Sequence, residues 1–265
     1  MKLSIITINL NNAEGLRKTI ESVVFQTFTD YEYIIIDGAS TDGSVDIIKQ
    51  YADKITYWVS EPDKGIYNAM NKGILQAKGE YCLFLNSGDW LLDDSVLDNI
   101  FSVVFDDDIV YGNVIKISDN GQEVYKGCAE LGISLYSLTV KRMVHQACLI
   151  KRELFTTFGL YSESYKIASD WKFFVDTIIL GNVSVRHIDI IISCYDMKGI
   201  SSVNAEKTHE EFIEILRLAI PPRILSDIQE LDRYKHSSVV KLYDKLISNK
   251  SILRTYNFLF HGKSK

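Results

Sequence analysis

A carboxylate in the turn after a short apolar run is one group of this sequence that is suited to chemistry. Residues 81–85 are apolar and β-prone, and the turn Asn86-Ser87-Gly88-Asp89 ends them, so we predict a buried strand that stops in a tight turn. In open α/β sheets, ligands bind just beyond the carboxyl ends of the strands. A hard oxygen ligand there suits a divalent cation that carries a phosphorylated substrate. The alternative is that Asp89 only caps the turn or the next helix.

A second carboxylate, Asp37, also ends an apolar run. Residues 33–36 are predicted to form a buried strand, and a carboxylate at its end can accept hydrogen bonds from a uracil-type N–H group or a ribose hydroxyl. The alternative is an ordinary turn residue. Farther along, Lys72 could meet a diphosphate and Asp63 could contact a nucleoside or a sugar, because both flank one predicted helix. Their alternatives are a solvated lysine and a helix cap.

Strands and helices alternate regularly through the first 94 residues. The apolar pattern predicts strands at 3–8, 33–36, 56–59 and 81–85, and helices at 14–26, 45–51 and 66–77. Near-continuous apolar strands joined by helices predict an α/β fold with a mostly parallel central sheet that has helices on both faces. Three of the strands end in polar turns, at Asn9, at Asp37 and at residues 86–89. These turns should therefore meet along one rim and form a ligand crevice.

The regular alternation weakens after residue 94. The pattern predicts helices at 96–104 and 153–158, strands at 108–111, 147–150, 183–187 and 190–195, and a helix that begins at residue 169. The turn Asp119-Asn120-Gly121 between apolar runs predicts a hairpin, which indicates an antiparallel portion at the edge of the sheet. From residue 205 the pattern is helical and interrupted by Pro221-Pro222, so residues 205–265 are predicted to form a C-terminal helical extension.

Composition and charge limit the class of protein. The chain has 265 residues, of which 46% are hydrophobic and 24% are charged, as in ordinary globular proteins. Its net charge of −6 argues against nucleic acid as a partner. The four scattered cysteines indicate reduced, buried thiols, and the sequence shows neither a signal-peptide core nor an apolar run of about 20 residues. We therefore expect a cytoplasmic protein, at most peripheral on the inner face of the membrane.

Basic and aromatic residues are interleaved near the C-terminal end. Lys250, Arg254 and Lys263 lie around Tyr256 and Phe258. Such a segment suits peripheral contact with an anionic membrane surface. A solvated helix or a contact within a homodimer explains the same pattern, so these three alternatives stay open.

Four segments of the chain together resemble a known family. They are residues 3–11, 37–44, 60–73 and 86–89, and they occur in the family's order. The chain is similar to the inverting family 2 nucleotide-sugar glycosyltransferases, especially bacterial enzymes that build capsule, lipopolysaccharide and exopolysaccharide repeats. The resemblance covers roughly residues 1 to 200 and implies the GT-A fold. Residues 1–204 would then form the transferase domain, with a nucleotide-binding half at 1–94 and an acceptor-binding half at 95–204.

The resemblance implies a donor site in the first half of the chain. The nucleotide-sugar would be bound by Thr7, Asn9, Asn11, Asp37, Ser40, Asp63, Lys72 and Asn86. Within that set Asp37 matches the nucleobase-binding aspartate, and Asp89 matches the last aspartate of the family's DxD-type metal motif. Two positions depart from the motif, since Asn86 stands where the first aspartate is usual and Gly88 replaces an acidic neighbour. One carboxylate with the two donor phosphates can still hold Mg²⁺ or Mn²⁺.

In the second half, the resemblance implies that Asp170 is the general base, which takes the proton of the attacking acceptor hydroxyl. The alternative is that Asp170 is a helix N-cap, stabilised by the helix dipole. The dipeptide His145-Gln146 recurs in the resembling subfamily near the acceptor and the leaving group. Trp171 could stack on a sugar face or belong to the core.

These residues lead to one expected function and two alternatives. We expect a metal-dependent, inverting hexosyltransferase that moves a sugar from a nucleoside-diphosphate sugar to a hydroxyl of a glycan or lipid-linked glycan, in surface polysaccharide synthesis. One alternative is a sugar nucleotidyltransferase, although residues 10–15 do not resemble the Gly-rich, basic N-terminal loop of those enzymes. The other is a non-catalytic nucleotide-sugar-binding or assembly subunit, with which the reduced motif at residues 86–89 is compatible.

Overall fold

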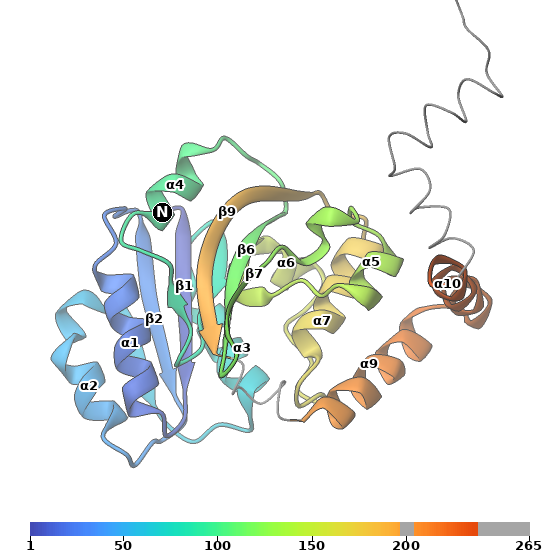
Figure 1. Ribbon diagram of the computed structural model, residues 1–265. Helices are drawn as coiled ribbons and strands as arrows, with labels where there is room; N and C mark the ends of the chain where they lie inside the picture. Colours follow the sequence, from blue (N-terminus) through green and yellow to red (C-terminus); the bar gives the residue numbers. More distant parts are fainter. Residues whose placement is uncertain (197–203, 238–265) are drawn as a thin grey trace, which may run out of the picture. The chain divides into compact units, whose positions relative to one another are not determined.

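The computed structural model describes residues 1–196 and 204–237 of the chain (Figure 1). The chain divides into two compact units, Met1–Ile215 (unit 1) and Leu216–Lys265 (unit 2). Every site residue predicted from the sequence lies in unit 1. The part of the predicted helical extension after residue 237, with the basic and aromatic C-terminal segment, lies outside the described residues. Membrane contact, dimerisation and the domain boundary at residue 205 therefore stay predictions.

The first half of the chain forms the parallel arrangement that the sequence predicts. Strands β1 (Leu3–Asn9), β2 (Tyr31–Asp37), β3 (Tyr57–Ser60) and β4 (Tyr81–Phe84) are parallel in the order β3-β2-β1-β4. Between them lie α1 (Ala13–Val24), α2 (Ser44–Gln50), the short 3₁₀ helix η1 (Ala52–Lys54) and α3 (Ile66–Gln76). The carboxyl ends of β1, β2 and β4 consequently lie along one rim of the sheet.

Alternate residues of these strands supply two apolar cores, one on each face of the sheet. Ile5 of β1 packs in one core with Leu16 of α1, and Ile6 packs in the other with the buried residues of α3. Figure 1 shows α1 and α2 on the same side of β1 and β2. Gly73 lets α3 lie close to β1, because a Cβ atom on Gly73 would be 2.5 Å from Cγ2 of Ile6.

The second half extends the sheet, mostly with antiparallel pairs. The antiparallel pairs join β8 (Cys148–Lys151) to β4 and to β6 (Ile109–Ser118), β7 (Gly121–Tyr125) to β6, and β5 (Trp90–Leu91) to β9 (Val185–Asp196). Strands β6 and β9 are parallel. The sheet order is β3-β2-β1-β4-β8-β6-β9-β5, with β7 beside β6. The predicted α/β fold with its helix-flanked, mostly parallel sheet is confirmed, and so is the hairpin.

Two strands continue past the ends that the sequence predicts. Strand β6 continues beyond Tyr111, where the predicted strand 108–111 ends, and β9 joins the predicted strands 183–187 and 190–195 into one. The pairing register of β6 with β9 shifts at Asn113, so a bulge absorbs the irregularity without ending either strand. Gly112 permits this close approach, because a Cβ atom on it would lie 2.6 Å from the carbonyl oxygen of Ile190. The predicted breaks are therefore wrong.

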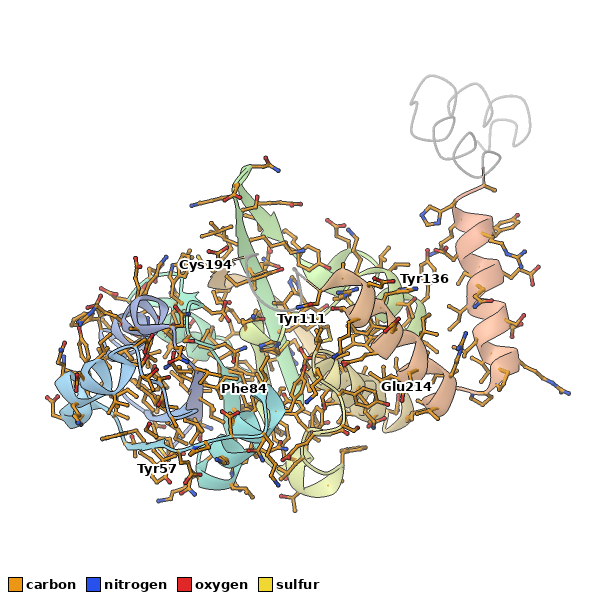
Figure 2. The ribbon with its side chains drawn as sticks, turned by 90° about the horizontal axis from the view of Figure 1, so that it is seen from below. Tyr57, Phe84, Tyr111, Tyr136, Cys194 and Glu214 are labelled. Carbon is orange, nitrogen blue, oxygen red and sulfur yellow. The ribbon has the colours of Figure 1, made fainter. Side chains whose placement is uncertain are left out.

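Several short helices cover the second half of the sheet. They are α4 (Val96–Ser102), η2 (Gly127–Glu130), α5 (Leu135–Val140), η3 (His145–Ala147), α6 (Glu153–Thr157), α7 (Ser169–Phe174) and the π-helical segment η4 (Val175–Leu180). Helices α5, α6 and α7 contribute buried residues to the same apolar core as α3. Phe84 lies within this core, with the ring centroids of Phe155 and Tyr161 at 6.0 and 5.5 Å (Figure 2). All four cysteines are buried and unpaired, as the sequence predicts.

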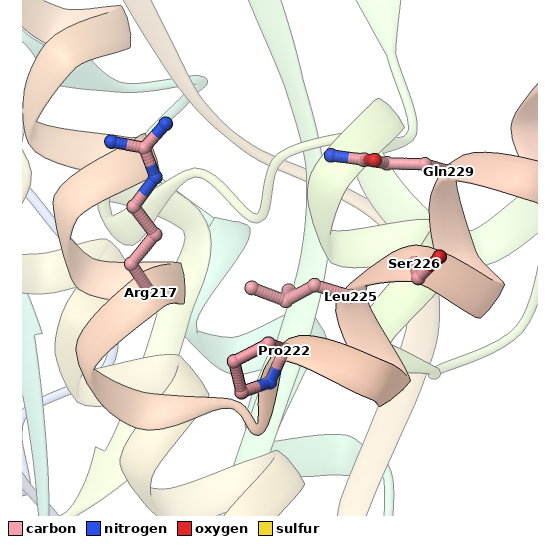
Figure 3. A pocket seen from close by; sticks show the side chains of 5 residues that line it. All are labelled: Arg217, Pro222, Leu225, Ser226 and Gln229. Atoms are coloured by element: carbon pink, nitrogen blue, oxygen red, sulfur yellow. The ribbon is translucent and has the colours of Figure 1, made fainter.

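The C-terminal part of the described chain is helical. Helix α9 (Ala205–Ala219) is followed by α10 (Pro222–Lys235), and the Pro-Pro pair separates them as predicted. Within unit 2, a pocket of about 360 Å³ is lined by Arg217, Pro222, Leu225, Ser226 and Gln229 (Figure 3). These lining residues include no carboxylate and no predicted site residue. None of the helices in the described ranges has the length and apolar composition that crossing a bilayer requires.

Candidate active site

Three strand ends meet at the rim that the sequence predicts. Asn9, Asp37 and Ser60 lie side by side, because β1 pairs Asn9 with Asp37 and β2 pairs Asp37 with Ser60. The turn after β4 joins them, since the Ser87 N–H donates to the carbonyl oxygen of Ile8 over 3.0 Å. The structure therefore brings the polar ends of β1, β2 and β4 to one place.

Asp37 lies in a dense hydrogen-bond network at this rim. Its Oδ1 accepts from Nδ2 of Asn9 (2.7 Å) and Oγ of Ser40 (2.6 Å), and its Oδ2 accepts from the Ser40 N–H (2.9 Å) and Oγ of Ser60 (2.6 Å). Burial raises the pKa of Asp37, but these hydrogen bonds prevail and hold it below its ordinary value. Among the described residues, Oδ1 of Asn9 is buried without a hydrogen-bond partner, which leaves an unpaired acceptor beside Asp37.

Asn11 and Asp63 lie close to the same network. The Asn11 N–H donates to Oγ of Ser40 over 2.8 Å. Asp63 lies directly against Gly38, because a Cβ atom on Gly38 would be 2.5 Å from Oδ2 of Asp63. Asn11 and Asp63, which the resemblance implies as donor-binding residues, therefore lie beside Asp37.

Thr7 and Lys72 direct their side chains elsewhere. The Thr7 hydroxyl is buried and lies 3.0 Å from the hydroxyl of Tyr33, so the Thr7 side chain does not face a ligand at the rim. Nζ of Lys72 forms an ion pair with Glu61 at 2.7 Å and donates to the Pro62 carbonyl oxygen over 3.1 Å. A diphosphate contact from Lys72 would compete with Glu61.

Asp89 occupies the turn after β4, where its side chain is buried. The residue is 8% exposed, and its Oδ2 accepts from Nε2 of Gln146 over 3.1 Å. Burial is the strongest effect on this carboxyl and raises its pKa to about 6, although the Gln146 hydrogen bond and the nearby His145 act in the opposite direction. Ser95 is the N-cap of α4, so Asp89 does not cap that helix.

Asp170 lies in the first turn of α7 and is bound through both carboxylate oxygens. Its Oδ2 is 2.7 Å from Nδ1 of His145, and its Oδ1 accepts from the Tyr67 hydroxyl over 2.8 Å. Burial raises the pKa of Asp170, but His145 and Tyr67 together prevail and hold the pKa below its ordinary value. The N-cap of α7 is Ala168, so Asp170 does not cap its own helix.

The consecutive residues His145 and Gln146 connect the two carboxylates. They belong to η3, directly before β8, and β8 runs antiparallel to β4, so they lie beside the turn that follows β4. His145 thereby contacts Asp170 while Gln146 contacts Asp89. Nε2 of His145 also lies 3.3 Å from Nδ2 of Asn86. Burial lowers the pKa of His145, but the Asp170 carboxylate prevails and raises it above its ordinary value.

Trp171 is part of the core of unit 1. Its Nε1 donates to the carbonyl oxygen of Leu138 over 3.0 Å, and its ring lies 4.5 Å from the ring centroid of Phe212. An indole that is 5% exposed offers little surface for stacking on a sugar.

Tyr67 and Glu211 also belong to this site, although neither was predicted from the sequence. The buried Tyr67 hydroxyl contacts Asp170 from α3, and its segment had been singled out without a role for the tyrosine. Glu211 on α9 accepts hydrogen bonds from the backbone N–H groups of residues 166–168, over 2.8, 2.9 and 2.9 Å. Those residues directly precede α7, so Glu211 fixes the approach to Asp170. The sequence signal for Glu211 was its spacing, because Glu211 lies four residues before Ile215 and so on the same, buried face of the helix.

The turn after β4 offers few ligands for a cation. Within residues 1–196 and 204–237, no group of three or more His, Cys, Asp or Glu side chains could hold a metal ion. Asp89 supplies one carboxylate, and Oδ1 of Asn86 is buried without a hydrogen-bond partner in the same ranges. This donor set fits Mg²⁺ or Mn²⁺ bound mainly through donor phosphates, because Mg²⁺ commonly keeps few protein ligands.

The fold and the site define a class of protein. A parallel α/β half with a polar rim, joined to a second half that adds a buried carboxylate, is the arrangement of GT-A glycosyltransferases. Residues 4–159 match the model described as "Glycosyl transferase family 2". The match covers more than half of the chain, and the chain belongs to that family. The protein is a glycosyltransferase, and neither alternative function is supported.

Two relatives indicate the biological setting. A protein of Mycobacterium bovis (strain BCG / Pasteur 1173P2) named "PGL/p-HBAD biosynthesis glycosyltransferase" is 29% identical over 259 residues, which cover 95% of this chain and 94% of that protein. The "Poly(ribitol-phosphate) beta-N-acetylglucosaminyltransferase TarP" of Staphylococcus aureus (strain N315) is 28% identical over 205 residues, 66% of this chain and 62% of TarP. These relatives support sugar transfer in bacterial glycan synthesis.

Two solved structures share the fold. The structure of S. aureus TarS 1–349 in complex with UDP-GlcNAc has a TM-score of 0.67 and 18% identity, and covers 100% of this chain and 77% of that chain. The mannosyltransferase PcManGT from Pyrobaculum calidifontis, in complex with GDP-Man and Mn²⁺, has a TM-score of 0.65 and 16% identity, covering 89% and 70%. Both confirm the GT-A fold of this chain.

Proposed function

We propose that this glycosyltransferase moves a hexose-type sugar from a nucleoside-diphosphate sugar to a hydroxyl of a glycan or lipid-linked glycan, with inversion and with Mg²⁺ or Mn²⁺. The observation that best supports the proposal is the bridge formed by His145 and Gln146. These adjacent residues hold Asp170, the candidate base, and Asp89, the candidate cation ligand, in one hydrogen-bonded site. Surface polysaccharide synthesis is the process that would use this reaction.

Asp170 is suited to general-base catalysis. Because its pKa lies below the ordinary value, the carboxylate is ionised at neutral pH. The acceptor oxygen attacks the anomeric carbon, the bond from that carbon to the diphosphate oxygen breaks, and the hydroxyl proton moves to Asp170. Tyr67 and His145 hold the carboxylate in place during this step. A single displacement inverts the anomeric centre and leaves no covalent bond between sugar and enzyme.

The rim of the first half is suited to the nucleotide end of the donor. Oδ1 of Asn9, which is buried without a hydrogen-bond partner among the described residues, lies beside Asp37 and Ser40 and is the candidate acceptor for a base or a ribose. Asp89 is mostly ionised at neutral pH, because its pKa is about 6. When bound, the cation would neutralise charge on the departing nucleoside diphosphate. Neighbours solved with UDP-GlcNAc and with GDP-Man and Mn²⁺ support a donor of this class.

A donor screen tests the proposal. Thermal unfolding would be measured with UDP-, GDP- and dTDP-sugars, each with and without Mn²⁺. We expect one nucleotide class to raise the Tm in the presence of Mn²⁺, by about 5–10 °C at a concentration of roughly 100 times the Kd. Slow release of nucleoside diphosphate from that donor should follow without any acceptor. Binding with no release would instead indicate a non-catalytic protein, and no shift with any donor would contradict the proposal.

A further inference from the structure

Two lysine side chains and the backbone of an arginine contact one tyrosine of the β6–β7 hairpin. Nζ of Lys116 lies 3.3 Å from the centroid of the Tyr125 ring, and Nζ of Lys141 lies 6.0 Å from it. The Tyr125 hydroxyl accepts from the backbone N–H of Arg142 over 3.0 Å and donates to the backbone carbonyl oxygen of Arg142 over 3.2 Å. We call Lys116, Lys141 and Arg142 the cation cluster. Figure 2 shows the pale green hairpin extending beyond the rest of the sheet.

The cation cluster lacks a carboxylate partner. In the part of the chain that the structure describes, none of its members forms an ion pair, whereas Lys126 on the same hairpin pairs with Asp189 at 3.0 Å. Glu123 stands opposite Lys116 in the strand register and attracts it without forming an ion pair. Burial and the two neighbouring cations hold the pKa of Lys116 below its ordinary value. Since like charges held together cost free energy, the arrangement favours an anionic ligand.

Arg142 connects the cation cluster to the candidate active site. Its guanidinium carbon lies 4.2 Å from the ring centroid of Phe212. Asp170 is close enough to act on the pKa of Arg142, and both Arg142 and Asp89 act on the pKa of Tyr195. Arg142 is exposed, and no described residue accepts a hydrogen bond from its guanidinium. A guanidinium can bind two phosphate oxygens at once.

We propose that the cation cluster binds a phosphate group of the acceptor. This inference rests on the proposed function and adds that the acceptor is anionic. The cluster lies on strands and loops of the second half, whereas the donor diphosphate is expected at the turn after β4. Two kinds of acceptor carry such a phosphate group. One is a polyol-phosphate polymer, and the other is a polyprenyl-linked glycan with its diphosphate. The relative TarP is named for an acceptor of the first kind.

Binding of two phosphate probes tests the inference and separates the sources. Fluorescently labelled poly(ribitol phosphate) represents the polymer, and polyprenyl diphosphate in neutral detergent micelles represents the lipid. The wild type is compared with Arg142→Gln and Lys116→Gln, and with the control Lys126→Gln, which removes a paired lysine from the same hairpin. We expect the wild type to bind one probe, more weakly as salt increases, and its Kd to rise about tenfold in the two cluster variants only.

Several outcomes would overturn the inference. The wild type binding neither probe would do so, and so would cluster variants that bind as tightly as the wild type. A loss of Mn²⁺-dependent donor affinity in Arg142→Gln, with probe binding intact, would instead assign the cluster to the donor diphosphate. Donor hydrolysis by the wild type is measured separately. Failure of the proposed function would therefore appear as absent hydrolysis while probe binding persists.

Discussion

Two buried carboxylates of the candidate active site differ because their hydrogen-bond partners differ. Asp89 accepts one hydrogen bond from Gln146, and burial prevails, so its pKa rises to about 6. Asp170 is contacted by His145 and by Tyr67 on separate oxygens, and these contacts prevail over burial. The raised pKa of Asp89 makes cation binding there dependent on pH, whereas Asp170 stays ionised throughout the neutral range, as a general base requires.

Substituting the candidate base tests the role of Asp170. Asp170→Asn should lower sugar transfer by about 10²–10⁴-fold while Mn²⁺-dependent donor binding persists, because the amide cannot take the acceptor proton. Its carbonyl oxygen can still accept from Tyr67, so the fold should survive. Asp176→Asn, which removes a carboxylate paired with Lys172 a few residues farther along, is the matched control and should transfer sugar normally. Normal turnover by Asp170→Asn would remove this assignment.

The raised pKa of Asp89 predicts a pH dependence of donor binding. A cation needs the ionised carboxylate, so Mn²⁺-dependent donor affinity should fall about tenfold per pH unit as the pH drops below about 6. Calorimetric titration between pH 8 and pH 5 measures this dependence. A constant affinity over that range would show that Asp89 does not hold the cation.

Acid unfolding of the protein would not explain a loss of donor affinity below pH 6. Because folding raises the pKa of Asp89, the folded state takes up a proton as the pH falls through 6, and the stability contribution of this group increases there. Asp37 and Asp170 have lowered pKa values, so their contributions are lost only as the pH falls below the ordinary aspartate range. The Tm of the ligand-free protein measured over the same pH range is the control.

At the scale of elements, α9 supports the helix that carries the candidate base. Glu211 accepts three backbone hydrogen bonds from residues 166–168, and Phe212 packs on Trp171. A helix from the predicted C-terminal extension therefore contributes to the geometry of the transferase site within unit 1. Glu211 is a positioning residue, since it acts on Asp170 through the loop before α7.

Weakening this support should lower the rate of transfer more than it lowers donor binding. Glu211→Gln should reduce kcat roughly tenfold with donor Kd unchanged, and should lower the free energy of unfolding by about 1–3 kcal/mol, because the amide replaces one accepting oxygen with an NH2 donor and so loses at least one of the three hydrogen bonds. Glu210→Gln, at an exposed position of the same helix, is the control. Steady-state kinetics and denaturant unfolding provide the two measurements. A donor Kd that rises as much as kcat falls would contradict a positioning role.

Local sequence patterns predicted most elements of the fold, for physical reasons. The strands β1, β2 and β4 are apolar on both faces and end in polar turns, so their positions and their common rim follow from the residue order. The continuity of β6 and β9 could not be predicted from these local patterns. It depends on a bulge near Gly112 and on the pairing of distant strands, and no local pattern encodes that pairing.

At the scale of the whole molecule, the site depends on contacts between residues far apart in the chain. Asp89, Gln146 and Asp170 were each predicted as site residues, but the bridge between them arises from the antiparallel pairing of β8 with β4. Tyr67 could not be distinguished from an ordinary core tyrosine without that arrangement. The sequence thus predicted the candidate residues, and the topology determines which of them touch.

A structure of the protein with a bound nucleoside-diphosphate sugar and Mn²⁺ tests the central claim most directly. We predict that the diphosphate lies at the turn after β4 with the cation on Asp89, that the nucleoside lies beside Asp37, and that the anomeric carbon faces Asp170. A donor bound away from this rim, or an anomeric carbon on the side remote from Asp170, would contradict the account.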